Sequence, residues 1–114
     1  MRPSVHTDTF TRDNLPPEAN WPDLLLDGFD YPDQLNAAYE LTDAMVAKGF
    51  GDHTALIGNG RRRTYKELTD WTNRLAHTLV DDLGLKPGNR LMIRSANNPA
   101  MVACWLAATK AGAV

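Results

Sequence analysis

Apolar side chains repeat at helical spacing once the chain passes residue 32. Five apolar residues fall on one predicted face together with Thr42, and they are Leu35, Ala38, Tyr39, Met45 and Val46. Asp33 is suited to cap the N-terminus of such a helix, and Gly49 is suited to end it. The pattern predicts one helix between these two residues.

Two short runs typical of strands follow, Thr54–Gly58 and Arg61–Tyr65. The dipeptide Asn59-Gly60 separates them, and both residues accept the positive φ that a tight hairpin turn needs. We therefore predict a β-hairpin.

Thr64 and Glu67 have the spacing of a capping box and predict a helix that begins near Tyr65. Its inner face is expected to hold the residues at i, i+3, i+4 and i+7 spacing, namely Leu68, Trp71, Thr72, Leu75, Leu79 and Leu83. Gly84 is expected to end this helix, and residues 85–89 form a turn around Pro87-Gly88.

The C-terminal part predicts a strand over Arg90–Arg94 and a helix over Pro99–Ala111 that Asn98 caps. Gly112 ends that helix, and Ala113-Val114 resembles the opening of another strand. A strand, a helix and a strand in this order predict the start of a βαβ unit with parallel strands. The expected fold class is α/β.

This last helix is apolar on nearly all sides, so we expect it to be covered on all sides. A parallel strand likewise needs partners on both edges. We therefore expect the chain to be a fragment of a longer protein, and we expect self-association through its exposed edges near Val114.

Residues 1–32 differ from the rest, because five of the seven prolines lie there. Residues 1–52 carry three basic and ten acidic side chains, whereas residues 53–114 carry nine basic and four acidic ones. We predict an extended N-terminal arm over 1–32 and an incomplete α/β subdomain over 33–114. The arm is expected to pack on the basic half through its apolar anchors, with a separate binding function as the alternative; the anchors are Phe10, Leu15, Trp21, Leu24 to Leu26 and Phe29.

The whole chain has 114 residues, is 43% hydrophobic and carries a net charge of −2. This size allows one domain or part of one, and the charge argues against nucleic acid as a partner. Its single cysteine excludes an internal disulfide and a multi-cysteine zinc site. We find no secretory signal and no run long enough to span a membrane, so we expect a cytoplasmic protein without a membrane partner.

The search for chemistry yields few candidates. Gly58–Arg63 begins like a dinucleotide fingerprint, but it enters a strand and the hairpin is favoured. Cys104 lies among apolar residues and is expected to be a buried, inert thiol. His6, His53 and His77 are scattered, and His53 and His77 have no nucleophile arranged beside them. Asp81-Asp82 is expected to be a solvated helix end.

Two segments leave a choice. Arg61-Arg62-Arg63 is suited to hold phosphate, but it is also typical of a charged strand edge that opposes aggregation. The loop Ser95–Asn98 follows a predicted parallel strand, where open α/β sheets usually bind ligands. A turn and helix cap explains its asparagines equally well.

Four segments, in order and at suitable spacing, resemble motifs of the adenylate-forming (AMP-binding) superfamily. Arg63–Leu68 resembles the first core motif, with its Thr/Ser-Tyr-x-Glu-Leu element, and Leu106–Val114 the second, Leu-x-x-x-Lys-Ala-Gly-Ala-Val. Leu85–Arg90 is similar to Leu-x-Pro-Gly-Asp-Arg, and Asn97-Asn98-Pro99 to the Pro-Asn-Ser segment. Two departures are that Asn89 replaces the commoner Asp and that Ala96-Asn97-Asn98 replaces Pro-Asn-Ser.

Four further segments resemble the aryl-CoA ligase branch, above all the 2-aminobenzoate–CoA ligases and then the benzoate–CoA ligases. They are Asp13–Pro17, Trp21-Pro22, Tyr31–Asn36 and Val102–Ala107. The resemblance implies a ligase for an aryl carboxylate that uses ATP, Mg²⁺ and coenzyme A. A ligase for another acyl substrate and a non-catalytic interaction module are the alternatives.

The resemblance also implies that the family's phosphate loop, adenosine motifs, acyl pocket and catalytic lysine lie beyond the second core motif. We therefore assign no catalytic, cofactor-binding or metal residue within 1–114, and we expect the segment alone to be inactive. Five residues match motif positions, and a scaffolding role is expected for them: Thr64, Tyr65, Glu67, Lys110 and Gly112.

Overall fold

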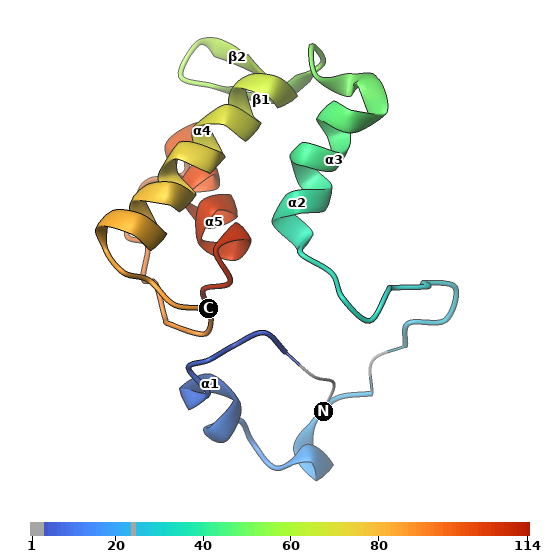
Figure 1. The fold of residues 1–114 in the computed structure, drawn as a ribbon. Coiled ribbons are helices and arrows are strands. Elements are labelled where there is room, and N and C mark those ends of the chain that lie inside the picture. The colour runs from blue at the N-terminus through green and yellow to red at the C-terminus, as the bar shows by residue number, and fades with distance from the viewer. Residues whose placement is uncertain (1–3, 24) are drawn as a thin grey trace.

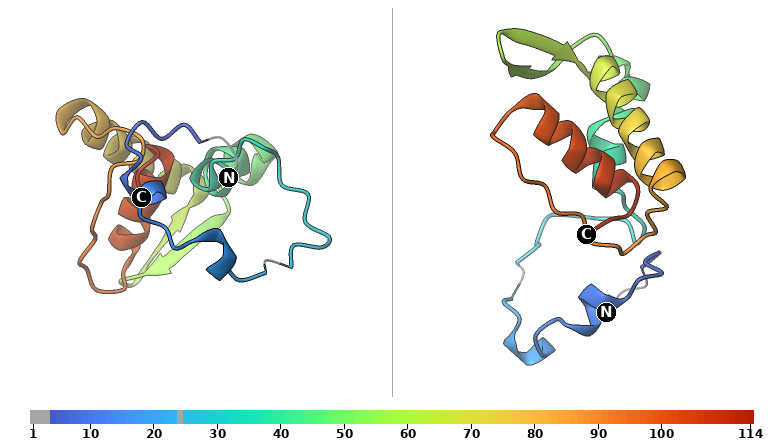
Figure 2. Two further views of the ribbon diagram at one scale, coloured as in Figure 1. Left: turned by 90° about the horizontal axis from the view of Figure 1, so that it is seen from below. Right: turned by 90° about the vertical axis from the view of Figure 1, so that its left-hand side faces the viewer.

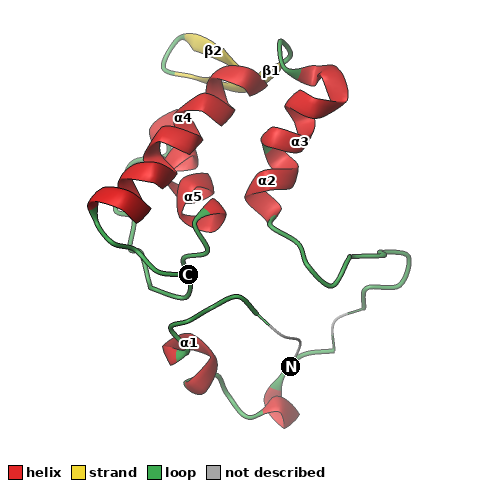
Figure 3. Ribbon diagram, viewed as in Figure 1, coloured by secondary structure: helices red, strands yellow, loops and turns green. Residues whose placement is uncertain are grey.

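The structure, a computed structural model, describes residues 4–23 and 25–114. Helix α5 (Pro99–Lys110) lies between α4 (Tyr65–His77) on one side and α2 (Ala37–Leu41) on the other (Figure 1). Helix α3 (Asp43–Met45) follows α2, and the hairpin of β1 (Thr54–Gly58) and β2 (Arg61–Thr64) lies across one end of the helices. The predicted α/β class is confirmed, with helices in the majority (Figure 3).

Helix α4 begins with the predicted capping box. The Glu67 backbone N–H donates to Thr64 Oγ1 at 3.2 Å, and the Thr64 N–H donates to Glu67 Oε2 at 2.9 Å. The bond from the Thr64 N–H lowers the pKa of Glu67, and the Arg61 side chain lowers it further. Two backbone donors that a helix start leaves open are thus satisfied locally.

The inner face of α4 differs from the predicted stripe. Leu68 and Thr72 are buried as predicted, but Thr69 and Ala76 are buried as well, and Leu83 is 71% exposed. The exposure of Leu83 has a local cause, because Thr78–Asp82 continues α4 as a π-helical turn. This turn has more residues per turn than an α-helix, so the face that points inward shifts before Leu83 is reached.

The core lies where α2, α4 and α5 meet. Four buried residues form its centre, and they are Ala38, Leu68, Ala103 and Leu106. Partly buried side chains from β1, α4 and α5 surround them: Ala55, Leu56, Trp71, Leu75 and Val102. The small residues let the helices approach closely.

The hairpin forms as predicted, with antiparallel pairing and a turn at Asn59 (φ 53°) and Gly60 (φ 70°). The register shifts between Thr54 and Leu56, which marks a bulge in β1. Gly58 lies against the first residue of α5, since a Cβ there would come within 2.7 Å of the Pro99 ring. The end of β1 therefore packs directly on the start of α5.

The single helix predicted between Asp33 and Gly49 is wrong in two respects. Asn36, not Asp33, is the N-cap, because its Oδ1 accepts from the Ala38 and Tyr39 backbone N–H groups. The helix also breaks at Thr42 (φ −128°, ψ −83°), whose Oγ1 donates to the Ala38 carbonyl at 2.6 Å. A threonine side chain bonded to its own helix competes with the regular backbone pattern.

The strand predicted over Arg90–Arg94 does not form. Within the described residues, regular strand occurs only in β1 and β2. Backbone bonds in the parallel pattern nevertheless join the segment to Val114: the Leu91 N–H donates to the Val114 carbonyl, and the Val114 N–H donates to the Asn89 carbonyl, both at 2.8 Å. A pairing this short leaves Met92 94% exposed.

Helix α5 begins and ends as predicted, with Asn98 Oδ1 accepting from the Met101 N–H at 3.0 Å, Pro99 at the first position and Gly112 after the end. Trp105 is 53% exposed, so the described residues leave one side of this apolar helix uncovered. No helix in the described part of the chain is long and apolar enough to cross a bilayer.

The N-terminal residues extend away from the helices, with a short helix α1 (Phe10–Asp13) and a 3-10 turn at Glu18–Asn20 (Figure 2). The Cα radius of gyration is 15.9 Å, above the about 13 Å of a compact domain of similar length. The proposed anchors do not bury themselves on the body: all the described ones are exposed, namely Phe10, Leu15, Trp21, Leu25, Leu26 and Phe29. Leu24 lies outside the described residues.

We predict opposite effects from removing two buried hydroxyl groups. Thr72 Oγ1 has no hydrogen-bond partner among the described residues, so Thr72→Val removes an unpaired polar atom and should raise the free energy of unfolding by about 1 kcal/mol. Thr42→Val removes a hydroxyl whose single hydrogen serves the Ala38 carbonyl and the Asp43 carboxylate, and should lower it by about 1 kcal/mol. Urea unfolding followed by circular dichroism measures both. A larger loss in Thr72→Val than in Thr42→Val would contradict this assignment.

Candidate functional site

Lys110, the lysine of the second motif, joins three helices. Its Nζ donates to Asn73 Oδ1 on α4 at 2.6 Å and pairs with Asp43 Oδ2 at the start of α3. The Lys110 side chain is 17% exposed and that of Asp43 31% exposed, so the pair is shielded from water. Such a pair is stronger than a fully exposed one.

The charge of Asp43 is maintained by its partners. Burial alone would raise its pKa, but hydrogen bonds from Lys110 and from Thr42 Oγ1 outweigh burial, and the pKa is lowered. Asp43 is therefore ionised at neutral pH. Lys110 is held by its neighbours and acts as a structural cation.

Asn36 links the start of α2 to the end of α5. Its Oδ1 caps α2, and its Nδ2 donates to the carbonyls of Thr109 and Lys110, at 3.2 Å each. Carbonyl groups at the end of a helix otherwise need water or a cap. One amide side chain therefore closes both α2 and α5.

The turn within the motif segment Leu85–Arg90 packs on the end of the motif segment Leu106–Val114. The Gly88 N–H donates to the Gly112 carbonyl at 2.7 Å, and a Cβ at Gly112 would lie 3.1 Å from Pro87 Cβ. Gly88 has φ +92°, a conformation that favours glycine. Pro87 and Gly88 thus form one structural unit with Gly112, although 25 and 24 positions separate them from it in the sequence.

The arginine run is largely committed to contacts within the chain. Arg61 Nη2 lies 2.9 Å from Glu67 Oε1, and the Arg63 guanidinium stacks 4.5 Å from the centroid of the Trp71 ring. Two of the three guanidinium groups thus bind side chains of α4. This arrangement favours the charged edge over the phosphate site.

The loop Ser95–Asn98 has the predicted role of a turn and cap. Asn98 Oδ1 caps α5, while Asn98 Nδ2 donates to Ser95 Oγ at 3.3 Å. Ser95 Oγ in turn donates to the Ala96 carbonyl at 3.0 Å. These bonds account for Ser95 and Asn98 as turn and cap residues.

The other candidates lie apart from one another. Cys104 is partly buried, not fully buried as expected, and lines an apolar groove between α4, α5 and residues 91–94 with a volume of about 360 Å³. His77 lies 3.0 Å from Asp81 on the exposed end of α4, and His53 contacts the Phe50 ring. Among the residues that the structure describes, no group of three or more His, Cys, Asp or Glu side chains is placed to hold a metal ion.

Several connecting residues were not singled out by the sequence. Asp43 and Asn73 lie 67 and 37 positions from Lys110, and Asp8 lies 81 positions from its partner Asn89. No local spacing signals such pairs. For Asn89 alone a signal exists, because this residue departs from the pattern of the superfamily.

The model of a family described as "AMP-binding enzyme" matches residues 44–114. The chain belongs to this family. The match includes α4, α5, the hairpin and the turn between α4 and α5. The resemblance found in the motifs is thereby confirmed at the level of the family.

Relatives in the AMP-binding family include two hydroxybenzoate ligases. The 3-hydroxybenzoate–CoA ligase of Aromatoleum sp. (strain CIB) is 35% identical over 80 residues, 70% of this chain and 15% of the relative. The 3-hydroxybenzoate–CoA/4-hydroxybenzoate–CoA ligase of Thauera aromatica has the same identity and coverage. The acetyl-coenzyme A synthetase of Streptomyces avermitilis is 34% identical over 112 residues, 94% of this chain and 16% of the relative.

The chain thus spans about one sixth of the length of these curated relatives. No solved structure matches it. In this chain the motif residues lie at helix ends. Thr64 and Glu67 cap the start of α4, Lys110 at the end of α5 pairs with Asp43, and Gly112 follows the end of α5.

We predict that Lys110→Met destabilises the fold by about 1–3 kcal/mol, because it leaves the Asp43 carboxylate and Asn73 Oδ1 without their partner. Asp43 has a lowered pKa, so its contribution is complete above the ordinary value of 3.8 and is lost as the pH falls through the folded value. The difference between the two proteins should therefore shrink below about pH 4.

Urea unfolding of both proteins at several pH values measures this difference. Lys48→Met, at an exposed lysine, is the matched control and should change the free energy of unfolding by less than about 0.5 kcal/mol. A loss in Lys110→Met that does not vary with pH would show that the Asp43 charge is not its cause.

Proposed function

We propose that these 114 residues form the structural N-terminal segment of a cytoplasmic, AMP-forming aryl-CoA ligase, with 2-aminobenzoate or benzoate as the first candidate substrates. The family match over residues 44–114 carries this proposal. The two hydroxybenzoate–CoA ligases among the relatives support an aryl carboxylate. The aryl-CoA ligase resemblance of residues such as Asp13–Pro17 supports it independently.

The proposed reaction has two steps. The carboxylate attacks the α-phosphorus of ATP, which forms an aryl-adenylate and releases pyrophosphate. The thiol of coenzyme A then attacks the acyl carbon and displaces AMP, with loss of the thiol proton. The mixed anhydride supplies the leaving group that a free carboxylate lacks, and Mg²⁺ with hydrogen-bond donors stabilises the charge on the phosphates.

In this proposal residues 1–114 contribute shape. Residues 1–32 form an arm and 33–114 part of an α/β subdomain, and the catalytic and ligand residues belong to other parts of the complete enzyme. Lys110 supports this role, because Asp43 and Asn73 engage its ammonium group.

The relatives also support a broader alternative. One is an acetyl-coenzyme A synthetase, so a ligase for an aliphatic acid shares this part of the chain.

We predict that the product of the natural reading frame containing this segment releases AMP with ATP, coenzyme A and 2-aminobenzoate or benzoate. The isolated 114-residue chain should release none. Quantification of AMP over a panel of benzoates, acetate and longer fatty acids is the measurement, with reactions lacking coenzyme A or the acid as controls.

Activity with aliphatic acids only would replace the aryl substrate and keep the ligase. Reproducible turnover by the purified 114-residue chain would contradict the structural role. No AMP release with any acid would favour the second candidate function.

The second candidate is a non-catalytic module that binds a second copy of itself. The groove between α4, α5 and residues 91–94 favours it, because Leu91, Met92 and Ile93 line one side. The backbone groups of residues 92–94 have no backbone partner among the described residues. A free edge of this kind pairs readily with another chain.

If this module exists, sedimentation velocity should show a dimer whose fraction rises with the concentration of the 114-residue chain. Met92→Lys should abolish the dimer, because it places a charge in the apolar groove. Leu83→Lys, at a residue 71% exposed and outside the groove, is the control and should leave the dimer intact. A monomer at every concentration would rule this candidate out.

A further inference from the structure

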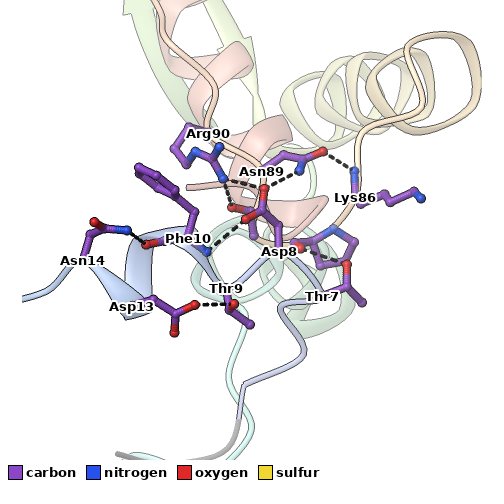
Figure 4. A network of polar contacts seen from close by, with 11 residues as sticks. Thr7, Asp8, Thr9, Phe10, Asp13, Asn14, Lys86, Asn89 and Arg90 are labelled. Carbon is purple, nitrogen blue, oxygen red and sulfur yellow. Dashed lines mark hydrogen bonds and ion pairs between the residues drawn. The ribbon is translucent and has the colours of Figure 1, made fainter.

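The Asp8 carboxylate is the centre of a junction between the N-terminal segment and the turn Pro87–Arg90. Asp8 accepts hydrogen bonds from the Phe10 backbone N–H at 3.0 Å, from Asn89 Nδ2 at 2.8 Å and from Arg90 Nη1 (Figure 4). Its side chain is 25% exposed. A carboxylate with three donors, one of them a cation, is held firmly in place.

Backbone contacts reinforce the same junction. The Pro87 carbonyl accepts from the Thr7 and Asp8 N–H groups, both at 3.0 Å, and from Thr7 Oγ1 at 3.2 Å. The Phe10 ring lies under the Arg90 guanidinium, 4.5 Å from its carbon. At Gly88 a Cβ would overlap the Asp8 carbonyl oxygen, so only glycine allows the segment to come this close.

Asn89 serves both the turn and the N-terminal segment. Its Oδ1 accepts from the Lys86 N–H at 2.9 Å, which closes the turn, while its Nδ2 donates to Asp8. An aspartate, the commoner residue in the superfamily motif, could keep the first bond. It has no amide to donate to Asp8, and two carboxylates would then meet at hydrogen-bonding distance and repel each other.

The turn held by Asp8 also carries the parallel pairing with the end of the chain. Gly88, Asn89 and Leu91 exchange backbone hydrogen bonds with Gly112 and Val114. The turn is therefore fixed on one side by residues 7–10 and on the other by residues 112–114. Neither side is close to the turn in the sequence.

We propose that residues 7–10 are a strap that closes over the turn Pro87–Arg90 and holds it against Gly112–Val114, with Asp8 as its clasp and Asn89 as the residue adapted to receive it. Its polar contacts converge on Asp8 and Pro87, so loss of the Asp8 contacts is expected to release it. Closing it fixes the parallel pairing, and opening it frees the turn. The proposal is independent of the proposed ligase activity.

The electrostatics agree with a clasp that is closed at neutral pH. The Phe10 N–H and the Asn89 amide lower the pKa of Asp8, partial burial opposes this, and Arg90 adds to the lowering. Asp8 is therefore charged when it meets Asn89. Asn89→Asp should open the strap with the turn intact.

Hydrogen–deuterium exchange with mass spectrometry, on the product of the natural reading frame that contains this segment, tests the strap. Peptides covering Thr7–Phe10 should exchange at least about tenfold faster in Asn89→Asp and in Asp8→Asn.

Asp23→Asn removes the same charge from an exposed residue of the N-terminal segment and should leave exchange at residues 7–10 unchanged. Peptides from α4 and α5 report folding. If Asn89→Asp loses protection there too, Asp8→Asn, which leaves the turn untouched, decides the question. Unchanged exchange at residues 7–10 in Asp8→Asn would overturn the proposal.

Discussion

The close packing of α5 through its alanines is the constraint on which the other contacts depend. Ala103 and Ala107 are fully buried, and their small side chains let α2 and α4 pack closely on α5. In this packed arrangement one ammonium group at Lys110 reaches both Asp43 and Asn73. The ion pair and the shared cap thus hold an arrangement that packing first makes possible.

Polar side chains in this chain act mainly at the ends of elements. Asn36 closes α2 and α5 together, the Thr64–Glu67 pair opens α4, and Asn98 opens α5. In this chain the motif residues therefore mark where helices begin and end, and their polar groups are used in these caps and pairs.

Signals confined to a few residues predicted the structure well. The capping box at Thr64, the Asn59-Gly60 turn and the start of α5 at Asn98 form as expected, because each partner lies within four positions. Leu83 was misplaced because a π-helical turn changes the helical phase, which hydrophobic spacing does not reveal. Contacts such as Lys110 with Asp43 join residues 67 positions apart, and only the fold brings them together. The proposed arm was predicted from composition, but its attachment through Asp8 was not.

The contact between Gly58 and Pro99 has a consequence for how this part of the molecule can vary. Because a Cβ at residue 58 would come within 2.7 Å of the proline ring, the hairpin and α5 share a single small volume at that point. A larger residue at 58 requires a smaller or displaced one at 99, whereas the exposed loop 95–97 can accept insertions more freely. We therefore expect a change at one of these positions to require a change at the other, although 41 positions separate them in the chain.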